Sequence, residues 1–190
     1  PTLVRVLNAQ FAQVQWVVLA YLLTITSTMA GIGRLGDMAG KKRIYMLGFI
    51  IFTVGSVLCG VSPSIHWLIG FRILQAVGAA MTMALGAAII TEAFPPAERG
   101  RAMGIIGAIV SIGIAMGPAL GGVILGLMNW RWIFFVNLPV GIIGTYMVHR
   151  NLPAFTPGPK QKFDFGGAFA LSSSIFLLLL GLTLGQMHGF

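Results

Sequence analysis

Six stretches of this chain contain no aspartate, glutamate, lysine or arginine, and their lengths constrain its fold more than any other feature. They are 28, 28, 19, 29, 18 and 26 residues long and cover residues 6–33, 44–71, 73–91, 102–130, 132–149 and 165–190. About 20 mostly apolar residues are enough for a helix to cross a bilayer, so each stretch is long enough to cross it or nearly so. The sequence therefore predicts an all-α membrane protein, a polytopic bundle of about six transmembrane helices.

The composition excludes a soluble domain. Charged residues make up 8% of the chain and apolar residues 57%, whereas charged residues are about a quarter of a typical soluble protein. Cys59 is the only cysteine, so neither an internal disulfide nor a cysteine-based metal site can form, and we expect a small buried side chain there. We predict no metal site and no cofactor.

The basic residues indicate how the chain lies in the membrane. We place the spans at about residues 14–33, 44–61, 67–93, 102–127, 132–149 and 166–187. Arg5 and Arg131 then fall in one set of alternate loops, whereas the other set holds nine basic residues: Arg34, Lys41, Lys42, Arg43, Arg99, Arg101, Arg150, Lys160 and Lys162. Loops rich in Lys and Arg are normally cytoplasmic. We therefore expect the larger set on the cytoplasmic side of the inner (plasma) membrane and both termini on the outer side. The net charge of +8 therefore indicates topology and does not favour nucleic acid as a partner.

A proline-rich segment at residues 151–164 divides the chain. We predict a bundle at residues 1–150, a cytoplasmic linker at 151–164 and a further transmembrane helix at 165–190. Export machinery normally starts from a cytoplasmic N-terminus, so an outer N-terminus leads us to expect at least one more span upstream.

The first basic loop has the sequence GRLGDMAGKKR at residues 33–43. Its outer glycines, its acid and two of its cations are Gly33, Gly40, Asp37, Lys41 and Lys42. The glycines allow a tight turn, the acid is placed to cap a following helix, and the cations can reach helix C-termini or phospholipid headgroups. A solvated loop that only sets topology is the alternative. The run resembles the signature loop between helices two and three of the major facilitator superfamily, with Met38 where that family usually has Arg or Lys.

A second motif surrounds an arginine inside a predicted span, LIGFRILQAVGAA at residues 68–80. Burying Arg72 costs a few kcal/mol, so its side chain either snorkels to the interface or has partners in the bundle. Gln75 lies one turn deeper on the same face, and small alanines beside it let another helix approach, which favours partners. The stretch resembles the helix-four motif of the same superfamily. That resemblance implies a role for Arg72, with Gln75, in proton coupling.

A third motif is GIAMGPALGG at residues 113–122. Its small and helix-bending residues are Gly113, Gly117, Pro118, Gly121 and Gly122. A stripe of small residues often means only close helix packing, and proline introduces a kink. The run also matches, at every fixed position, the fifth-helix motif associated with antiporters of this superfamily.

The sequence WRWIFFVNLPVG at residues 130–141 is an aromatic interface anchor followed by a proline-kinked helix start. It resembles the start of helix six in the fourteen-span drug/proton antiporter branch, the EmrB/QacA-like transporters. The four motifs occur in the family's order over essentially the whole chain. The resemblance implies the major facilitator fold, with residues 1–150 as an N-terminal bundle lacking its first helix and 165–190 as the first of two extra central helices, so that the chain covers helices two to seven.

Glu92 lies at the end of its predicted helix, where the helix dipole disfavours an anion unless a cation pairs with it. Arg34, Lys41 or Arg101 could serve. With Asp37, such a cluster resembles the family's charge network that latches the cytoplasmic side in the outward-open state.

The resemblance implies a proton-driven exporter of drugs or other small lipophilic or cationic compounds that works by alternating access. The alternatives are an exporter of a specific metabolite, amino acid or siderophore and, more distantly, a membrane-embedded enzyme or sensor. We expect no enzyme, because no nucleophile has a base at useful spacing. No acid lies near midspan, so we expect the proton-carrying acid in the missing first helix. Helix faces suggest substrate-lining residues, with ordinary packing as the alternative: Tyr21, Thr24, Met81 and Ser111.

The expected partners follow from this interpretation. They are a small-molecule substrate, the lipid bilayer, the missing first helix and C-terminal bundle of the same transporter, and accessory export proteins.

Overall fold

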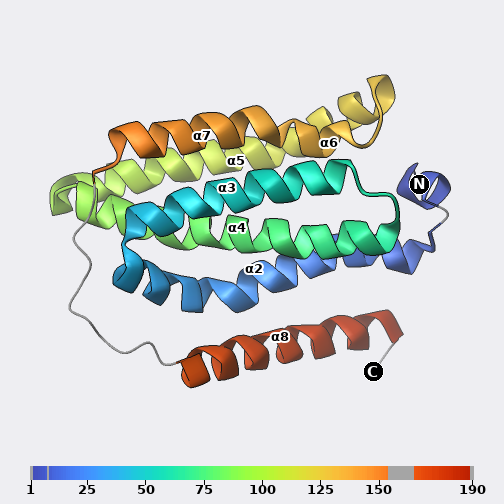
Figure 1. Cartoon of the computed structure of the whole chain (residues 1–190), viewed down its shortest axis with the longest axis horizontal. Coiled ribbons are helices and arrows are strands. Elements are labelled where there is room, and N and C mark those ends of the chain that lie inside the picture. Colours follow the sequence, from blue (N-terminus) through green and yellow to red (C-terminus); the bar gives the residue numbers. More distant parts are fainter. Residues whose placement is uncertain (1, 8, 154–164, 189–190) are drawn as a thin grey trace.

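The computed structural model of this chain describes residues 2–7, 9–153 and 165–188, which form helices joined by short connections (Figure 1). No strand occurs among these residues. The helices are α1 (Thr2–Val6), α2 (Phe11–Ala39), α3 (Lys41–Gly60), α4 (Ile65–Ala93), α5 (Pro96–Leu127), α6 (Trp132–Phe135), α7 (Asn137–Asn151) and α8 (Phe165–His188). The predicted linker begins where α7 ends, and residues 154–164 of it lie outside the described residues.

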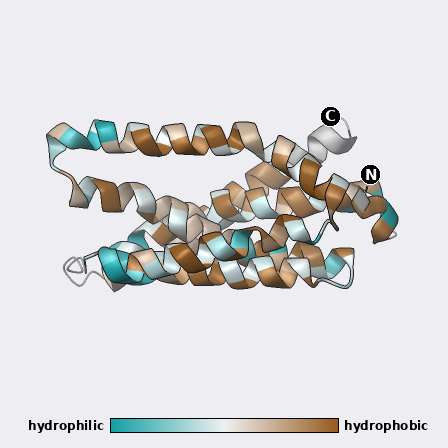
Figure 2. Ribbon diagram, turned by 90° about the horizontal axis from the view of Figure 1, so that it is seen from above, coloured by the Kyte–Doolittle hydropathy of each residue, from teal (hydrophilic) through white to brown (hydrophobic). Residues whose placement is uncertain are grey.

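The helices confirm the predicted fold class. Within the described residues, five segments are long and apolar enough to cross a membrane: α2, α3, α4, α5 and α6 with α7. The sixth predicted span corresponds to α8, a 24-residue helix that is apolar over residues 166–181. Figure 2 shows hydrophobic residues along most of the helices and hydrophilic residues gathered mainly at their ends.

The first basic loop is mostly helical, contrary to our prediction. α2 continues to Ala39, and only Gly40 separates it from α3. Gly40 has φ +94°, a conformation that side chains disfavour and glycine adopts readily. Asp37 therefore lies inside α2, and the expectation that it caps the following helix is wrong, because Gly40 is the N-cap of α3. Charged residues do not end a helix, so α2 continues past the apolar stretch.

Most other helix ends lie within about three residues of their predicted positions, but α5 begins at Pro96, six residues before the predicted start at 102. α3 ends at Gly60 and α4 begins at Ile65, so residues 61–64 form the expected turn. α4 ends at Ala93, before the two prolines, and Pro96 begins α5, where its missing N–H is not needed. Val136 alone separates α6 from α7, because Pro139 cannot donate the hydrogen bond that would continue the helix there.

α4 lies between α2 and α3 and carries most of the buried core (Figure 1). The small residues on its inner face, Ala76, Ala79 and Ala80, are buried. Gly78 meets the α3 backbone so closely that a Cβ there would lie 2.7 Å from the Gly48 carbonyl oxygen. The predicted close approach of another helix is therefore the α3–α4 contact.

The basic residues gather at one end of the bundle. Figure 1 shows that α2, α4 and α7 end, and α3 and α5 begin, at this end. Seven of the nine cations predicted to share one side lie there: Arg34, Lys41, Lys42, Arg43, Arg99, Arg101 and Arg150. We call it the basic end. Lys160 and Lys162 lie outside the described residues, and Arg5 and Arg131 lie at the opposite end.

The α3–α4 contact predicts that Gly78→Ala lowers the free energy of unfolding by about 1–3 kcal/mol, because the added methyl group must push two backbones apart. Gly70→Ala on the same helix is the matched control, since no atom lies within 4 Å of the added Cβ. The thermal midpoint of the purified protein in lipid nanodiscs measures both. Equal midpoints for the two variants would contradict the tight contact.

Candidate functional site

Arg72 has partners inside the bundle. Its Nε donates a hydrogen bond to the Val17 carbonyl oxygen of α2 at 3.2 Å, and its guanidinium lies 3.9 Å from the ring centroid of Tyr21. Its Nη1 donates to Oε1 of Gln75 at 2.8 Å. Snorkelling is thus not needed, because a neutral carbonyl, an aromatic face and an amide together solvate the charge.

Gln75 extends this arrangement to α3. Its side chain is 1% exposed, and its Nε2 donates to the Ser56 hydroxyl oxygen at 2.6 Å. Ser56 in turn donates to the Phe52 carbonyl oxygen at 2.9 Å. Cys59 is buried as expected, with its sulfur 3.9 Å from Gln75 Oε1. A continuous polar network therefore joins α2, α4 and α3 within an apolar interior, and we call it the Arg72 network.

A cavity of about 290 Å³ opens beside Arg72. Apolar side chains from α1, α2, α5 and α6 form most of its wall: Leu3, Val14, Val17, Val18, Leu125, Ile133 and Phe134. Trp130 also lines it and is 2% exposed, although the sequence had predicted only an interfacial anchor. Within the described residues its indole Nε1 has no hydrogen-bond partner. The Nε1 atom itself is buried, so Trp130 contributes its ring to the wall. The cavity thus combines a cation with apolar walls, which suits an amphiphilic molecule carrying an acceptor group.

No carboxylate accompanies this cavity in the part of the chain that the structure describes. Asp37, Glu92 and Glu98 all lie near the basic end, far along the helices from Arg72. The described residues also contain no group of three or more His, Cys, Asp or Glu that could hold a metal ion.

At the basic end, Lys41 joins three helices. Its Nζ lies 3.1 Å from Oδ1 of Asp37 on α2 and 2.5 Å from Oε1 of Glu92 on α4. Of the three cations that could pair with Glu92, the structure therefore selects Lys41. Two other residues of the predicted latch lie outside this cluster. Arg101 is exposed and forms no ion pair in the described part of the chain. Gly33 makes no close contact, since an added Cβ there would meet no atom within 4 Å.

Lys42 has a different role from its neighbour. Its Nζ donates to the carbonyl oxygens of His149 at 2.9 Å and Leu152 at 2.5 Å. It thereby caps the C-terminal end of α7, where the helix dipole favours a cation. At the opposite end, Arg131 Nη1 donates to the Gly60 and Ser62 carbonyl oxygens and caps α3 in the same way.

The third motif lies on α5, which has no buried residue. Among the described residues α5 contacts only α4 and α6. Nothing lies within 4 Å of a Cβ added at any glycine of the motif, namely Gly113, Gly117, Gly121 and Gly122. The helix continues through Pro118. The structure therefore brings no described helix against this stripe.

The four substrate-lining candidates lie in different environments. Tyr21 contacts Arg72, as described above. Thr24 is buried and donates to the Ala20 carbonyl oxygen of its own helix at 2.7 Å, and Met81 belongs to the packed core. Ser111 is exposed on α5. Only Tyr21 is brought to the Arg72 network.

Sequence reasoning missed Ser56 and Trp130. Ser56 is a polar residue within a charge-free stretch and adjoins Gly55, where a Cβ would lie 2.7 Å from Cα of Gln75. A serine beside a glycine in an apolar span was the available signal for a close polar contact. Trp130 and Trp132 flank the same arginine, and no local signal separates the buried one from the exposed one.

Comparisons with known proteins agree with this arrangement. The family model of the Major Facilitator Superfamily matches residues 1–189. The chain is 44% identical over 184 residues to the riboflavin transporter RibZ of Clostridioides difficile (strain 630), which covers 96% of this chain and 40% of RibZ. It is 35% identical over 175 residues to Multidrug resistance protein 3 of Bacillus subtilis (strain 168), which covers 92% of this chain and 34% of that protein. The chain thus spans two fifths or less of the length of these relatives.

A solved structure supports the fold. The crystal structure of a bacterial homologue of the human lysosomal transporter Spinster, inward-facing and unoccupied, superposes with a TM-score of 0.58 at 24% sequence identity. The match covers 85% of this chain and 40% of that one. It concerns the fold alone.

The Arg72 network predicts that Gln75→Leu lowers the free energy of unfolding by about 1–2 kcal/mol, because the arginine loses an acceptor and Ser56 loses a donor in a buried site. Thr82→Val on the same helix is the control, since that hydroxyl donates only to the Ala79 carbonyl oxygen of its own helix. Thermal unfolding in nanodiscs measures the difference. A Gln75→Leu variant as stable as Thr82→Val would show that the network contributes nothing to stability.

Proposed function

Because this chain belongs to the Major Facilitator Superfamily, we propose that the full-length protein exports small organic molecules by alternating access and is energised by the proton gradient. Membership of this family places it among multi-pass membrane transporters rather than enzymes, as the sequence predicted. Its motifs favour the fourteen-span drug/proton antiporter branch within the family. The observation that carries the proposal is the partly buried guanidinium of Arg72 beside a cavity.

Arg72 suits proton coupling because its charge is buried without a fixed counter-ion. Its described partners are a carbonyl oxygen, an amide oxygen and an aromatic ring. A carboxylic acid that approaches this cation releases its proton, since the nearby positive charge favours the carboxylate. When the acid moves away into an apolar environment, it is protonated again. Movement of one bundle against the other would therefore load and release a proton, with the acid on a segment outside this chain.

The ion pairs of Lys41 fit a latch at the basic end. They join α2, α3 and α4 through Asp37 and Glu92, so these three helices move as one body there. We propose that this cluster stabilises one of the two orientations of the bundle. Its position on the cytoplasmic side follows from the excess of Lys and Arg at that end.

Two classes of cargo are candidates. The multidrug relative favours lipophilic or cationic compounds. The riboflavin transporter, at 44% identity, favours a specific metabolite instead. The cavity beside Arg72 suits either class, because apolar walls surround a cation.

The proton-coupling proposal predicts that Arg72→Ala abolishes gradient-driven uptake. Everted vesicles from a drug-sensitive host that expresses the full-length protein are given an imposed proton gradient and either a cationic dye or riboflavin. Arg99→Ala is the control, since Arg99 lies far from the cavity and its Nε bonds only the nearby Phe94 carbonyl oxygen. Uptake by Arg72→Ala at the level of the control would contradict the coupling role. Uptake of riboflavin without dye would select the metabolite exporter, and movement of neither compound would contradict both cationic dyes and riboflavin as cargo.

Trp130→Phe is expected to raise KM for the transported compound about tenfold while leaving the maximal rate nearly unchanged, because the smaller ring removes part of the cavity wall that contacts the bound compound. Trp132→Phe is the matched control, since Trp132 is 50% exposed and does not line the cavity. Initial uptake rates over a range of substrate concentrations separate the two parameters. An equal effect of both substitutions would exclude a specific contact of Trp130 with the transported compound.

A further inference from the structure

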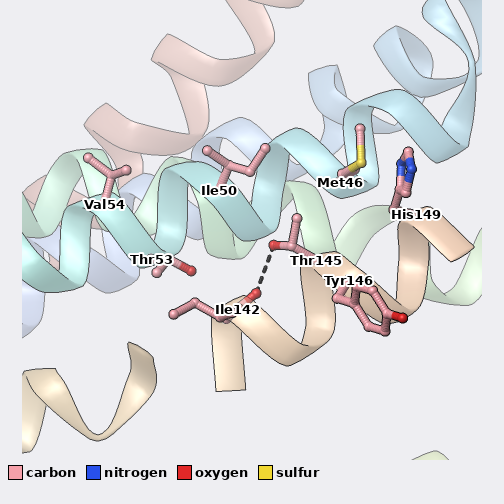
Figure 3. Close-up of a pocket in the computed structure, with 9 residues that line it drawn as sticks. Met46, Ile50, Thr53, Val54, Ile142, Thr145, Tyr146 and His149 are labelled. Atoms are coloured by element: carbon pink, nitrogen blue, oxygen red, sulfur yellow. Dashed lines mark hydrogen bonds between the residues drawn. The ribbon is translucent and has the colours of Figure 1, made fainter. Parts of the chain in front are cut away.

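A groove of about 460 Å³ lies between α3 and α7, apart from the cavity beside Arg72. Figure 3 shows its lining side chains extending from the two facing helices. The two helices are in close contact, since a Cβ added at Gly144 of α7 would lie 2.6 Å from the ring of Phe49 of α3. A Cβ added at Gly141 would collide with Thr53. The groove is therefore a fixed feature of the α3–α7 contact.

Hydrocarbon dominates the interior of this groove. Ile50 and Val54 line it from α3 and Ile142 from α7, and their side chains are 42%, 48% and 62% exposed. The two threonine hydroxyls in the groove, of Thr53 and Thr145, donate to carbonyl oxygens of their own helices at 2.7 Å, one of them drawn in Figure 3. The groove thus has no free side-chain hydroxyl donor in its middle and favours an apolar chain.

The end of the groove nearest the basic end is cationic. Tyr146 lines the groove there, and its hydroxyl oxygen accepts a hydrogen bond from Arg150 Nη1 at 3.0 Å. Lys42, which caps α7, and the exposed Arg43 lie at the same end. In the described ranges none of these three cations forms an ion pair with a carboxylate. Positive charge at the groove mouth is therefore available to an anion.

The length of the groove fits one leaflet of a bilayer. Along α3 it extends from Met46 to Val54, about 12 Å at the helical rise. One leaflet contributes about 15 Å of hydrocarbon. We propose that the groove binds an acyl chain of an anionic glycerophospholipid, whose phosphate is held by Arg150 and the neighbouring cations. Basic pockets between transmembrane helices are suited to anionic headgroups.

The full-length protein in phosphatidylcholine vesicles tests the proposal with two photoactivatable probes. One is phosphatidylglycerol and the other phosphatidylcholine, each with the reactive group on an acyl chain, and labelled peptides are mapped by mass spectrometry. We expect the phosphatidylglycerol probe to label the groove peptides of α3 and α7 more strongly. Arg150→Gln lowers this preference about fivefold, because one cation near a membrane surface contributes about 1 kcal/mol. Arg99→Gln is the control, at the same end of the bundle but outside the groove, and it should leave the preference for phosphatidylglycerol unchanged.

Ile142→Trp fills the groove and should remove the labelling by both probes. Ile143→Trp is the matched control, since Ile143 is the adjacent residue, is 57% exposed and does not line the groove. Equal elution profiles of the two variants show that both fold. Equal labelling by the two probes would overturn the proposal, as would labelling that survives Ile142→Trp. An unlabelled groove in a protein labelled elsewhere would mean that another protein segment covers it, and would overturn it as well.

Discussion

The burial of one positive charge in an apolar helix bundle is the constraint that organises this structure. The charge of Arg72 is solvated there because Val17 and Gln75 offer oxygen atoms and Tyr21 offers an aromatic face. Gln75 reaches Ser56 only because Gly55 lets α3 lie directly against α4. Close packing of α3 on α4 and satisfaction of the charge are therefore one requirement, since any side chain at Gly55 or Gly78 that separated these helices would also separate the members of the Arg72 network.

Charges at the ends of the bundle cap helices and join them. Lys42 of α3 caps α7, and Arg131, which immediately precedes α6, caps α3. The C-terminal carbonyls of both helices are therefore bonded by a cation from another segment. Lys41 adds the link to α2 and α4. The residues that would orient the chain in a membrane thus also hold its helices in register, because helix C-termini and cations are found at the same loops.

Much of the fold could be predicted from the sequence because charge-free length and proline act locally. The lengths of the charge-free stretches predict the spans, and Pro95 predicts the end of α4. The helical extension to Ala39 could not be predicted, since polar residues outside a membrane permit a helix as readily as a loop and only the positive φ of Gly40 ends it. Arg72 and Gln75 could be found because a polar residue in an apolar span is conspicuous. Trp130 could not, since its burial depends on where α6 lies relative to α2 and α4.

α3 connects the two sites described above without belonging to either alone. Ser56 faces α4 and the Arg72 network, whereas Thr53 and Val54, less than one turn earlier, face α7 and the groove. A Cβ at Gly141 would collide with Thr53, and Phe52 backbone atoms meet Gly78, so α3 is packed tightly on both sides within the same turn. A tightly packed helix transmits a displacement as a rigid body and does not absorb it. Any movement of α7 against α3 therefore displaces Ser56. The hydrogen bonds that solvate the Arg72 charge thus depend on the packing at both faces of α3.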